Sequence, residues 1–178
     1  MYLKGALLFS LLASSLAAPT ANGDRKVKRG VLTVQDYSQF QVSDGVAGNA
    51  LAEVNAKFPI DQSDLASVDP QDLAIIKAAR ETAEAAETDE GGFNDAIKAA
   101  GGTSTAAGKA LQNGKIKNKV LKLQLEVLAL QIEAAQGGSN NTAKIAEEQK
   151  KLDTNIKLDQ AAAGQPSQSV DFQGSDQP

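Results

Sequence analysis

The segment from Ile116 to Ala135 constrains the fold more than any other part of the chain, because it carries two separate apolar stripes at helical spacing. At about 100° per residue the stripes lie on different sides of a helix, with Gln124 and Gln131 between them. The stripes are Ile116, Val120, Leu123, Val127, Leu130 and Ala134 on one side, and Leu121, Leu125, Leu128, Ile132 and Ala135 on the other. A helix that is apolar on two sides must be covered by at least two neighbours, which predicts the central helix of a bundle.

Start and stop signals divide the rest of the chain into further helices. The strongest start is at Pro70, where Asp69 is the expected N-cap and proline occupies the first helical position. The other predicted helices cover residues 44–58 with Ser43 as N-cap, residues 93–100 between two glycine pairs, and residues 143–163. The predicted fold class is all-α: a single-domain helical bundle of about five helices with a central antiparallel helical hairpin.

The segments that flank these helices have different compositions. Residues 31–42 contain Tyr37 and Phe40 and are predicted to form an extended or short helical lead-in that packs its aromatic rings. Residues 164–178 are rich in Gly, Ser, Gln and Pro, with Val170 and Phe172 as their only large apolar side chains. The prediction is a helical domain over residues 30–163, followed by a disordered tail over residues 164–178.

The N-terminus has the pattern of a secretory signal peptide. Lys4 precedes an apolar run over residues 5–16, and Ser15-Leu16-Ala17 is a small-x-small cleavage pattern. The run is too short to span a bilayer, which needs about 20 residues. We therefore predict a signal peptide over residues 1–17 that ends at Ala17, no transmembrane segment, and a secreted, extracellular protein that is either free or associated with the cell wall.

Residues 18–29 form a polar and basic segment that ends in the dibasic pair Lys28-Arg29. We interpret it as a pro-segment that a kexin-type protease removes, so that the mature chain begins at Gly30; the alternative is a solvated run of charges. Loss of residues 1–29 would change the net charge from −4 to −8. Such an acidic chain is a poor candidate for nucleic-acid binding, which requires neutralisation of phosphates by cations.

The chain contains neither cysteine nor histidine, which removes whole classes of chemistry. Serine–histidine catalysis, thiolate nucleophiles, histidine metal ligands and disulfides are all excluded. Carboxylates remain, but the acidic residues Asp61, Asp64, Asp69 and Asp72 lack the spacing and the glycine of an EF-hand, and helix capping already explains Asp69 and Asp72. A glycosidase would need two placed carboxyl groups and aromatic platforms. We predict no enzyme activity, no metal and no cofactor.

Two surface features are candidates for binding or modification. Lys115, Lys119 and Lys122 share one helix face and form a candidate anion-binding face for an anionic glycan or lipid head group; the alternative is a solvated face beside an acidic neighbour. Asn140-Asn141-Thr142 is an N-glycosylation sequon in the expected turn between the last two helices, which makes Asn140 a candidate acceptor.

Four sequence runs together carry a resemblance to known proteins. These runs are Asp36-Tyr37-Ser38-Gln39-Phe40, residues 42–50, Gly92-Phe93-Asn94-Asp95-Ala96-Ile97 and residues 114–123. Over about residues 31–163 the chain resembles uncharacterised, cysteine-free small secreted proteins of filamentous fungi. The resemblance implies a secreted fungal protein, a candidate effector or a cell-wall-associated factor, and it brings no catalytic motif. A looser likeness to fungal hydrophobic-surface-binding proteins has no specific motif behind it.

These observations favour a secreted, non-enzymatic helical protein that acts by binding at the cell surface or at a host interface. Its expected partner is a protein, a glycan or a cell-wall component. The alternative is a carrier or adsorber of lipids or hydrophobic surfaces, in which the two-striped helix would expose its apolar faces to an apolar ligand. Only the carrier should change its melting temperature or compactness when lipid is added.

Overall fold

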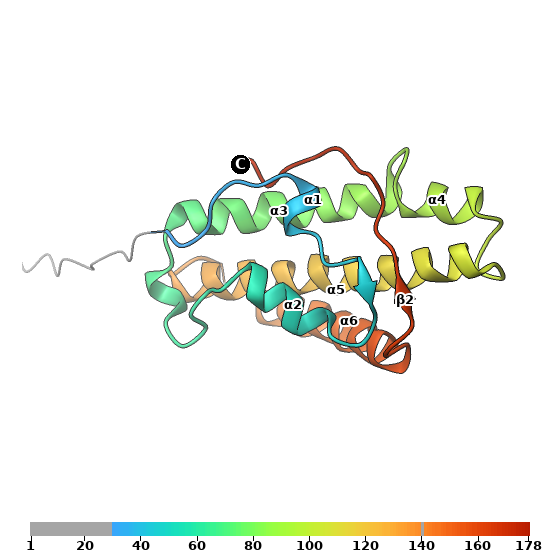
Figure 1. Ribbon diagram of the computed structural model, residues 1–178. Helices are drawn as coiled ribbons and strands as arrows, with labels where there is room; N and C mark the ends of the chain where they lie inside the picture. The colour runs from blue at the N-terminus through green and yellow to red at the C-terminus, as the bar shows by residue number, and fades with distance from the viewer. Residues whose placement is uncertain (1–29, 140) are drawn as a thin grey trace, which may run out of the picture.

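The computed structural model describes residues 30–139 and 141–178 and shows a helical bundle around one long helix (Figure 1). The fold class and the central antiparallel hairpin are confirmed, since α5 and α6 are joined by a short turn and pack together. A small antiparallel sheet adds to the predicted helices. In chain order the elements are α1 (Tyr37–Phe40), β1 (Gly45–Val46), α2 (Ala50–Lys57), the 3-10 helix η1 (Leu65–Ser67), α3 (Pro70–Thr88), α4 (Phe93–Ala99), α5 (Ala106–Ala135), α6 (Thr142–Ala161) and β2 (Pro166–Ser167).

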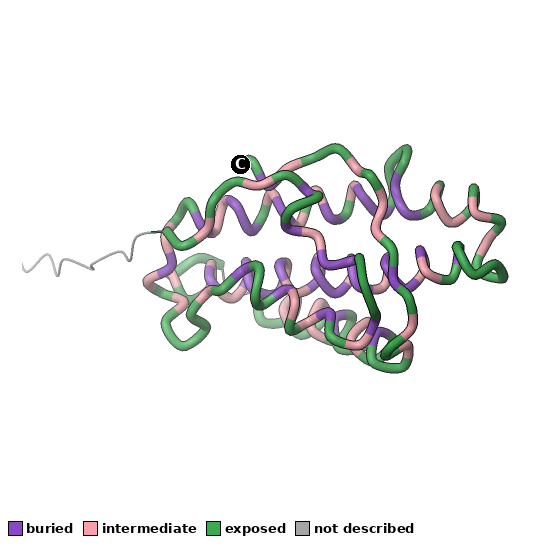
Figure 2. The backbone as a smooth tube through the Cα atoms, in the orientation of Figure 1, coloured by how far each residue is buried: buried purple, intermediate pink, exposed green. Residues whose placement is uncertain are grey.

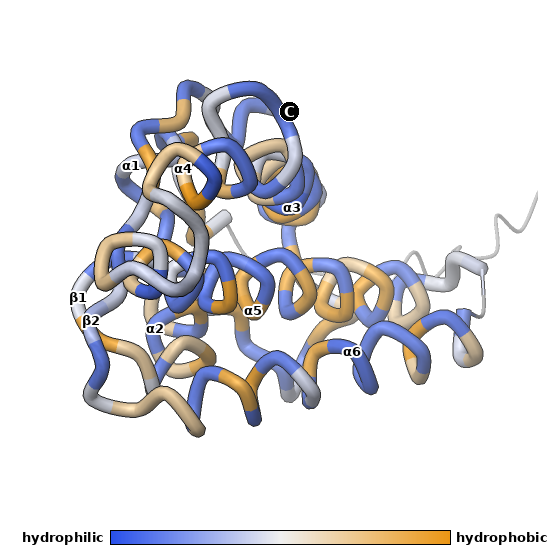
Figure 3. The backbone as a smooth tube through the Cα atoms, turned by 90° about the vertical axis from the view of Figure 1, so that its right-hand side faces the viewer, coloured by the Kyte–Doolittle hydropathy of each residue, from blue (hydrophilic) through white to orange (hydrophobic). Residues whose placement is uncertain are grey.

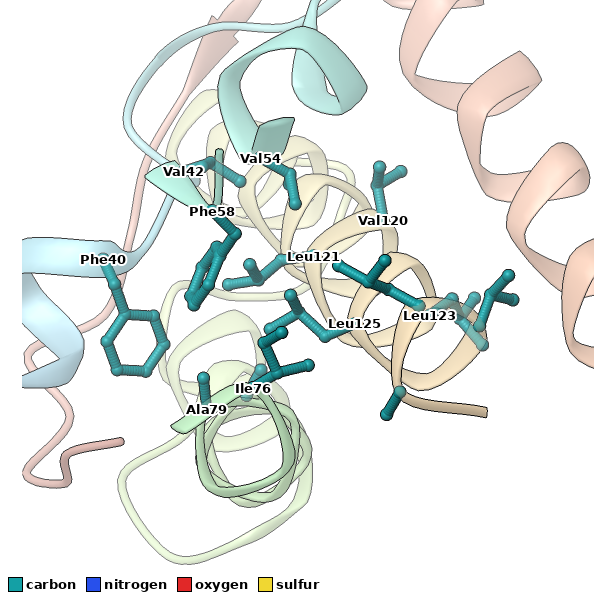
Figure 4. Close-up of a cluster of buried hydrophobic side chains, with 14 of the residues drawn as sticks. Phe40, Val42, Val54, Phe58, Ile76, Ala79, Val120, Leu121, Leu123 and Leu125 are labelled. Carbon is teal, nitrogen blue, oxygen red and sulfur yellow. The ribbon is translucent and has the colours of Figure 1, made fainter. Parts of the chain in front are cut away.

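Helix α5 is the centre of the bundle, and both of its predicted stripes are largely buried. Helices α3 and α6 make its most extensive contacts, and α2, α4 and η1 cover further parts of it. Figure 4 shows Leu121 and Leu125 beside Ile76 of α3, whereas Leu123, from the other stripe, points away from that side. Buried positions are concentrated where α3 and α5 face each other (Figure 2).

The start of α3 agrees with the sequence prediction, but α5 begins ten residues before the predicted Ile116. Asp69 caps α3 by accepting a hydrogen bond from the Gln71 amide at 2.8 Å, and Pro70 is the first helical residue. Helix α5 is capped by Thr105, whose hydroxyl accepts from the Gly108 amide at 3.0 Å. Glycines within a helix usually weaken it, and the sequence of this stretch, which contains Gly108 and Gly114, therefore gives little sign of a helix.

The first predicted helix, residues 44–58 with Ser43 as N-cap, is wrong at its start. Gly45 and Gly48 have φ of 87° and 119°, which is left-handed backbone that no helix contains, and α2 begins only at Ala50. The residues before it form β1, whose Gly45 and Val46 pair with Ser167 and Pro166 of β2. Ser43 is buried, and its carbonyl accepts a hydrogen bond from the Ser167 hydroxyl at 2.5 Å.

The structure also corrects the prediction that residues 164–178 are disordered. This segment, here called the C-terminal strap, runs beside the lead-in (Figure 1) and is fixed largely by backbone hydrogen bonds. The Gln168 amide donates to the Ala110 carbonyl at 3.0 Å, and the Gly174 carbonyl accepts from the Tyr37 amide at 2.7 Å. Phe172 packs edge-on against Tyr37, with 5.9 Å between ring centroids. A polar composition conceals such pairing, because backbone groups leave no signal in the side-chain sequence.

Two polar side chains of α5 are fully buried and bind the lead-in to the bundle. Lys117 donates to the carbonyls of Asp44 and Val46 at 3.0 and 3.1 Å and pairs with Glu53 at 2.8 Å. Asn118 donates to the Ala83 carbonyl of α3 at 2.7 Å and accepts from the Tyr37 hydroxyl at 2.9 Å. Buried polar groups are costly unless they are paired, so these bonds fix where residues 37–53 lie on α5.

Substitution of Gly114 by alanine tests how the strap is seated. The Gln168 carbonyl lies so close to Gly114 that a Cβ would overlap it. We expect G114A to destabilise the fold by about 1–3 kcal/mol in urea unfolding, despite the gain in helix propensity, and to expose the strap to a non-specific protease. Lys109→Ala on the exposed side of the same helix is the control. Equal protease resistance of both variants would contradict the close contact between the strap and Gly114.

The phenol of Tyr37 gives a second test of the lead-in. Burial raises the pKa of Tyr37 to about 12. Because the folded state favours the neutral phenol, its contribution to stability is complete below about pH 10 and is lost as the pH rises toward 12. In a chain that begins at Gly30, Tyr37 is the only tyrosine, so ultraviolet absorbance reports it alone. Titration near pH 10 in the folded protein would show that the ring is not buried.

Candidate functional site

Helices α3 and α6 both pack on α5 rather than on each other (Figure 3). A charged groove runs along α5 between them. It contains two adjoining hollows of about 280 and 270 Å³. Apolar side chains of α5, such as Leu123 and Leu130, lie at its floor. Five cationic and five anionic side chains line it: Lys77, Arg80, Lys122, Lys144 and Lys151, with Glu81, Glu84, Glu126, Glu133 and Glu148.

The two hollows meet at a bridge of three charged side chains, one from each helix. Glu126 of α5 forms an ion pair with Arg80 Nε of α3 at 3.2 Å and another with Lys144 Nζ of α6 at 2.8 Å. All three residues line both hollows. The hydrogen bond to Glu126 raises the pKa of Lys144. The bridge therefore links both walls of the groove to its floor.

Further ion pairs line the groove on either side of the bridge. Arg80 also pairs with Glu84 at 2.7 Å, Lys77 pairs with Glu133, and Lys151 pairs with Glu148 at 3.0 Å. Exposed pairs of this kind contribute little to stability, about 0–1 kcal/mol each, so they can exchange partners at low cost. The groove is thus chemically suited to a ligand that carries charges of both signs.

The sequence does not reveal this groove, although spacing within α6 accounts for some of its ion pairs. Glu147 and Lys151 are four residues apart and pair at 2.8 Å. Lys144 and Glu148 have the same spacing, but the closest partner of Lys144 is Glu126 of α5. That pair depends on which helices become neighbours, and spacing within one helix carries no signal for it.

The predicted anion-binding lysines are brought together, but around a carboxylate of the same chain. Lys115, Lys119 and Lys122 pair with Glu87 of α3 at 3.7, 3.2 and 3.3 Å. Burial alone would raise the pKa of Glu87, but the three ammonium groups outweigh it and hold the pKa below its usual range. The arrangement is the acidic-neighbour alternative, in which an internal anion lies where an external one would bind.

The acidic residues before and within the first turn of α3 have structural roles. Asp69 is the N-cap, and the buried carboxylate of Asp72 accepts from the amides of Val31 and Leu32. Asp61 and Asp64 line a hollow of about 80 Å³ beside them. Within residues 30–139 and 141–178, no three acidic side chains are placed so that they could hold a metal ion, and no helix is long and apolar enough to cross a bilayer.

The remaining predicted sites lie outside the described residues. These are the expected signal-peptide end at Ala17, the dibasic pair Lys28 and Arg29, and the glycosylation acceptor Asn140. Gly30, the residue expected to follow processing, is the first one that the structure describes.

Replacement of Glu87 by glutamine tests the lysine cluster. Three ammonium groups would lose their shared counter-ion, so we expect E87Q to lower the unfolding free energy by about 1–2 kcal/mol at pH 7. Because the pKa of Glu87 is lowered in the folded state, this difference should be full above about pH 4.5 and should disappear as acid protonates the carboxylate. Glu90→Gln, at an exposed position three residues on, is the control in urea unfolding at both pH values. An equal effect of E87Q and E90Q at pH 7 would contradict the assignment.

Comparison with known proteins places the chain in a family without assigning an activity. No curated protein and no solved structure matches it significantly. A family model described as a domain of unknown function, DUF8454, matches residues 32–171. The match includes α1 to α6 and extends through β2 into the strap. The chain therefore belongs to the DUF8454 family of domains of unknown function.

Proposed function

We propose that this chain is a secreted, non-enzymatic protein of a filamentous fungus that acts by binding at the cell surface or at a host interface. The signal-like N-terminus and the resemblance to small secreted fungal proteins support secretion and fungal origin. The groove between α3 and α6 is its binding surface, and the partner is a polypeptide segment that carries both acidic and basic side chains.

The balanced charge of the groove carries this proposal. Each of its three helices contributes both cations and anions, so a partner with charges of both signs can replace internal pairs by intermolecular ones. Charge complementarity of this kind provides specificity and orientation. A sugar ring would instead favour an exposed aromatic platform, whereas Tyr37, Phe40 and Phe93 are at most 1% exposed.

The state of the carboxylates supports a binding role over a catalytic one. A general acid or base works best with a pKa near the working pH. The pKa of Glu87 is instead held low by three lysines. Glu126 is shared between Arg80 and Lys144, as expected for a group that holds helices together.

The core favours a polypeptide partner over an apolar cargo. Leu123 and Leu130, on the groove side of α5, are only 7% and 6% exposed, so the apolar floor is almost covered by its neighbours. Leu121 and Leu125, on the second stripe, are fully buried. A carrier of lipid would have to open this core, and that is the alternative outcome of the test below.

Retention on isolated fungal cell walls tests the proposal. The double variant Arg80→Gln/Lys144→Gln removes the cations of the bridge, and we expect it to bind about 10- to 100-fold more weakly than the unmodified protein. Prior digestion of the walls with a protease should abolish retention of the unmodified protein.

The matched control is Lys150→Gln/Lys157→Gln, which makes the same change in net charge at exposed positions of α6 outside the groove. It should bind like the unmodified protein, and circular dichroism melting should show that both variants remain folded. Equal weakening by both variants would contradict the groove as the binding surface. Retention that survives the protease but not a glucanase would identify a glycan partner instead. A melting temperature that shifts with phospholipid vesicles would favour the carrier.

A further inference from the structure

The residue that would follow the predicted cleavage site, Gly30, lies next to a buried carboxylate at the start of α3. Gly30 follows the dibasic pair directly in the sequence and lies beside Asp69 and Asp72, at the start of this helix. Asp72, in that turn, is 3% exposed. Its carboxylate accepts from the Val31 amide at 2.9 and 3.1 Å and from the Leu32 amide at 2.9 Å. The first residues after the dibasic pair are therefore held by a group that would be costly to bury without partners.

The nitrogen of Gly30 is within reach of the same carboxylate. A Cβ on residue 30 would lie 3.0 Å from Asp72 Oδ1 and 3.7 Å from Asp69 Cγ. The backbone nitrogen is about 2.5 Å from that position by bond geometry, so it lies within about 5.5 Å of Oδ1. At such distances an opposite charge strongly favours the charged form of an amine. Glycine is the residue that permits this approach, since any side chain would press on the carboxylate.

The surroundings of Gly30 are acidic on more than one element. Asp69 and Asp72 belong to α3, and Asp61 and Asp64, from the loop that precedes it, line the same small hollow as Val31. The N-terminus of α3 adds a positive dipole that stabilises Asp72. In an uncleaved chain the nitrogen of Gly30 is a neutral amide, and it contributes no charge to this cluster. Cleavage before Gly30 would make it an ammonium group.

We propose that cleavage after Arg29 creates an α-ammonium group on Gly30 that forms an ion pair with Asp72 and locks the lead-in onto α3. The step is hydrolysis of the Arg29–Gly30 peptide bond by a dibasic-specific protease, with one water consumed. Arg29 leaves with a carboxylate, and Gly30 keeps the new amine, which takes up a proton. The inference rests on the predicted processing, and it makes maturation a stabilising step as well as a trimming step.

The test compares a free with an acetylated nitrogen on Gly30 in one and the same chain, and adds the uncleaved chain as a third sample. The three chains are residues 18–178, residues 30–178 with a free amine, and residues 30–178 with an acetylated amine. We expect the free amine to make the unfolding constant about 5- to 30-fold smaller than in the acetylated chain. Residues 18–178 should behave like the acetylated chain. When all three chains also carry Asp72→Asn, the free-amine chain should be no more stable than the acetylated chain. This comparison holds even if the substitution lowers the stability of all three chains equally.

A pH series on the unsubstituted chains serves if the Asp72→Asn chains do not fold. An ion pair favours the ammonium form in the folded state, so the advantage should be complete below about pH 8 and should be lost at higher pH, as the amine deprotonates. The carboxylates nearest to Gly30 are those of Asp72 and Asp69, and Asp61 and Asp64 line the adjoining hollow beside Val31. Equal stability of the free and acetylated chains at pH 7, or an equal advantage with Asp72→Asn, would overturn the ion pair.

N-terminal sequencing of the secreted protein distinguishes a failure of the predicted processing from a failure of the proposed ion pair. A start at a residue other than Gly30 would refute the processing itself. A start at Gly30 without the stability difference would refute only the ion pair. The free-amine and acetylated chains should be retained equally on cell walls at a temperature where both are folded, because the groove consists of other residues. The proposed binding function is therefore tested independently of the ion pair.

Discussion

The buried polar side chains of α5 are the constraint on which the rest of the fold depends. Lys117 and Asn118 are completely covered, so each needs partners inside the protein. Lys117 binds the carbonyls of Asp44 and Val46 and the carboxylate of Glu53. Asn118 binds the Tyr37 hydroxyl and the Ala83 carbonyl. Apolar stripes alone would allow the lead-in to slide along α5, since apolar contacts have little directional preference. Hydrogen bonds to specific atoms of the lead-in allow only one position of the lead-in on α5. A bundle without disulfides thereby obtains a defined arrangement for segments that form almost no regular structure.

The same helix separates two kinds of polar chemistry on its different sides. On the side of the lead-in and the strap, its polar groups are buried and bind mainly backbone carbonyls, as Asn113 does when it donates to the Pro166 carbonyl at 2.8 Å. Toward α3 and α6 its charged groups are partly exposed and bind other charged side chains, as Glu126 does. Buried pairs are expensive to break, whereas exposed pairs are not. The helix is therefore fixed on one side and able to exchange partners on the other, a division that suits a binding protein.

Sequence reasoning predicted those features that depend on side chains close together in the chain. The Asp69-Pro70 start of α3 and the two-sided burial of α5 follow from local chemistry and periodicity. The early start of α5 was missed because Gly108 and Gly114 indicate a loop, whereas in the structure they make room for the carbonyls of Gly102 and Gln168. The order of the strap was missed because backbone atoms hold much of it. The groove was missed because Glu126 meets Arg80 and Lys144 only when three helices assemble.

The pairing of the lead-in with the strap determines when the fold can be completed. An isolated bridge joins Asp36 to Ser175, and the Gln35 amide donates to the Asp176 carboxylate, 141 positions further along the chain. Contacts between residues so far apart in sequence slow folding, because a long loop has to close before they form. A ribosome must have synthesised nearly the whole chain before these contacts exist. Helices α3 to α6 can pair as they emerge, but the part of the core around Tyr37 can form only after the last residues have been synthesised. Truncation near the C-terminus would thus leave the beginning of the protein unfinished.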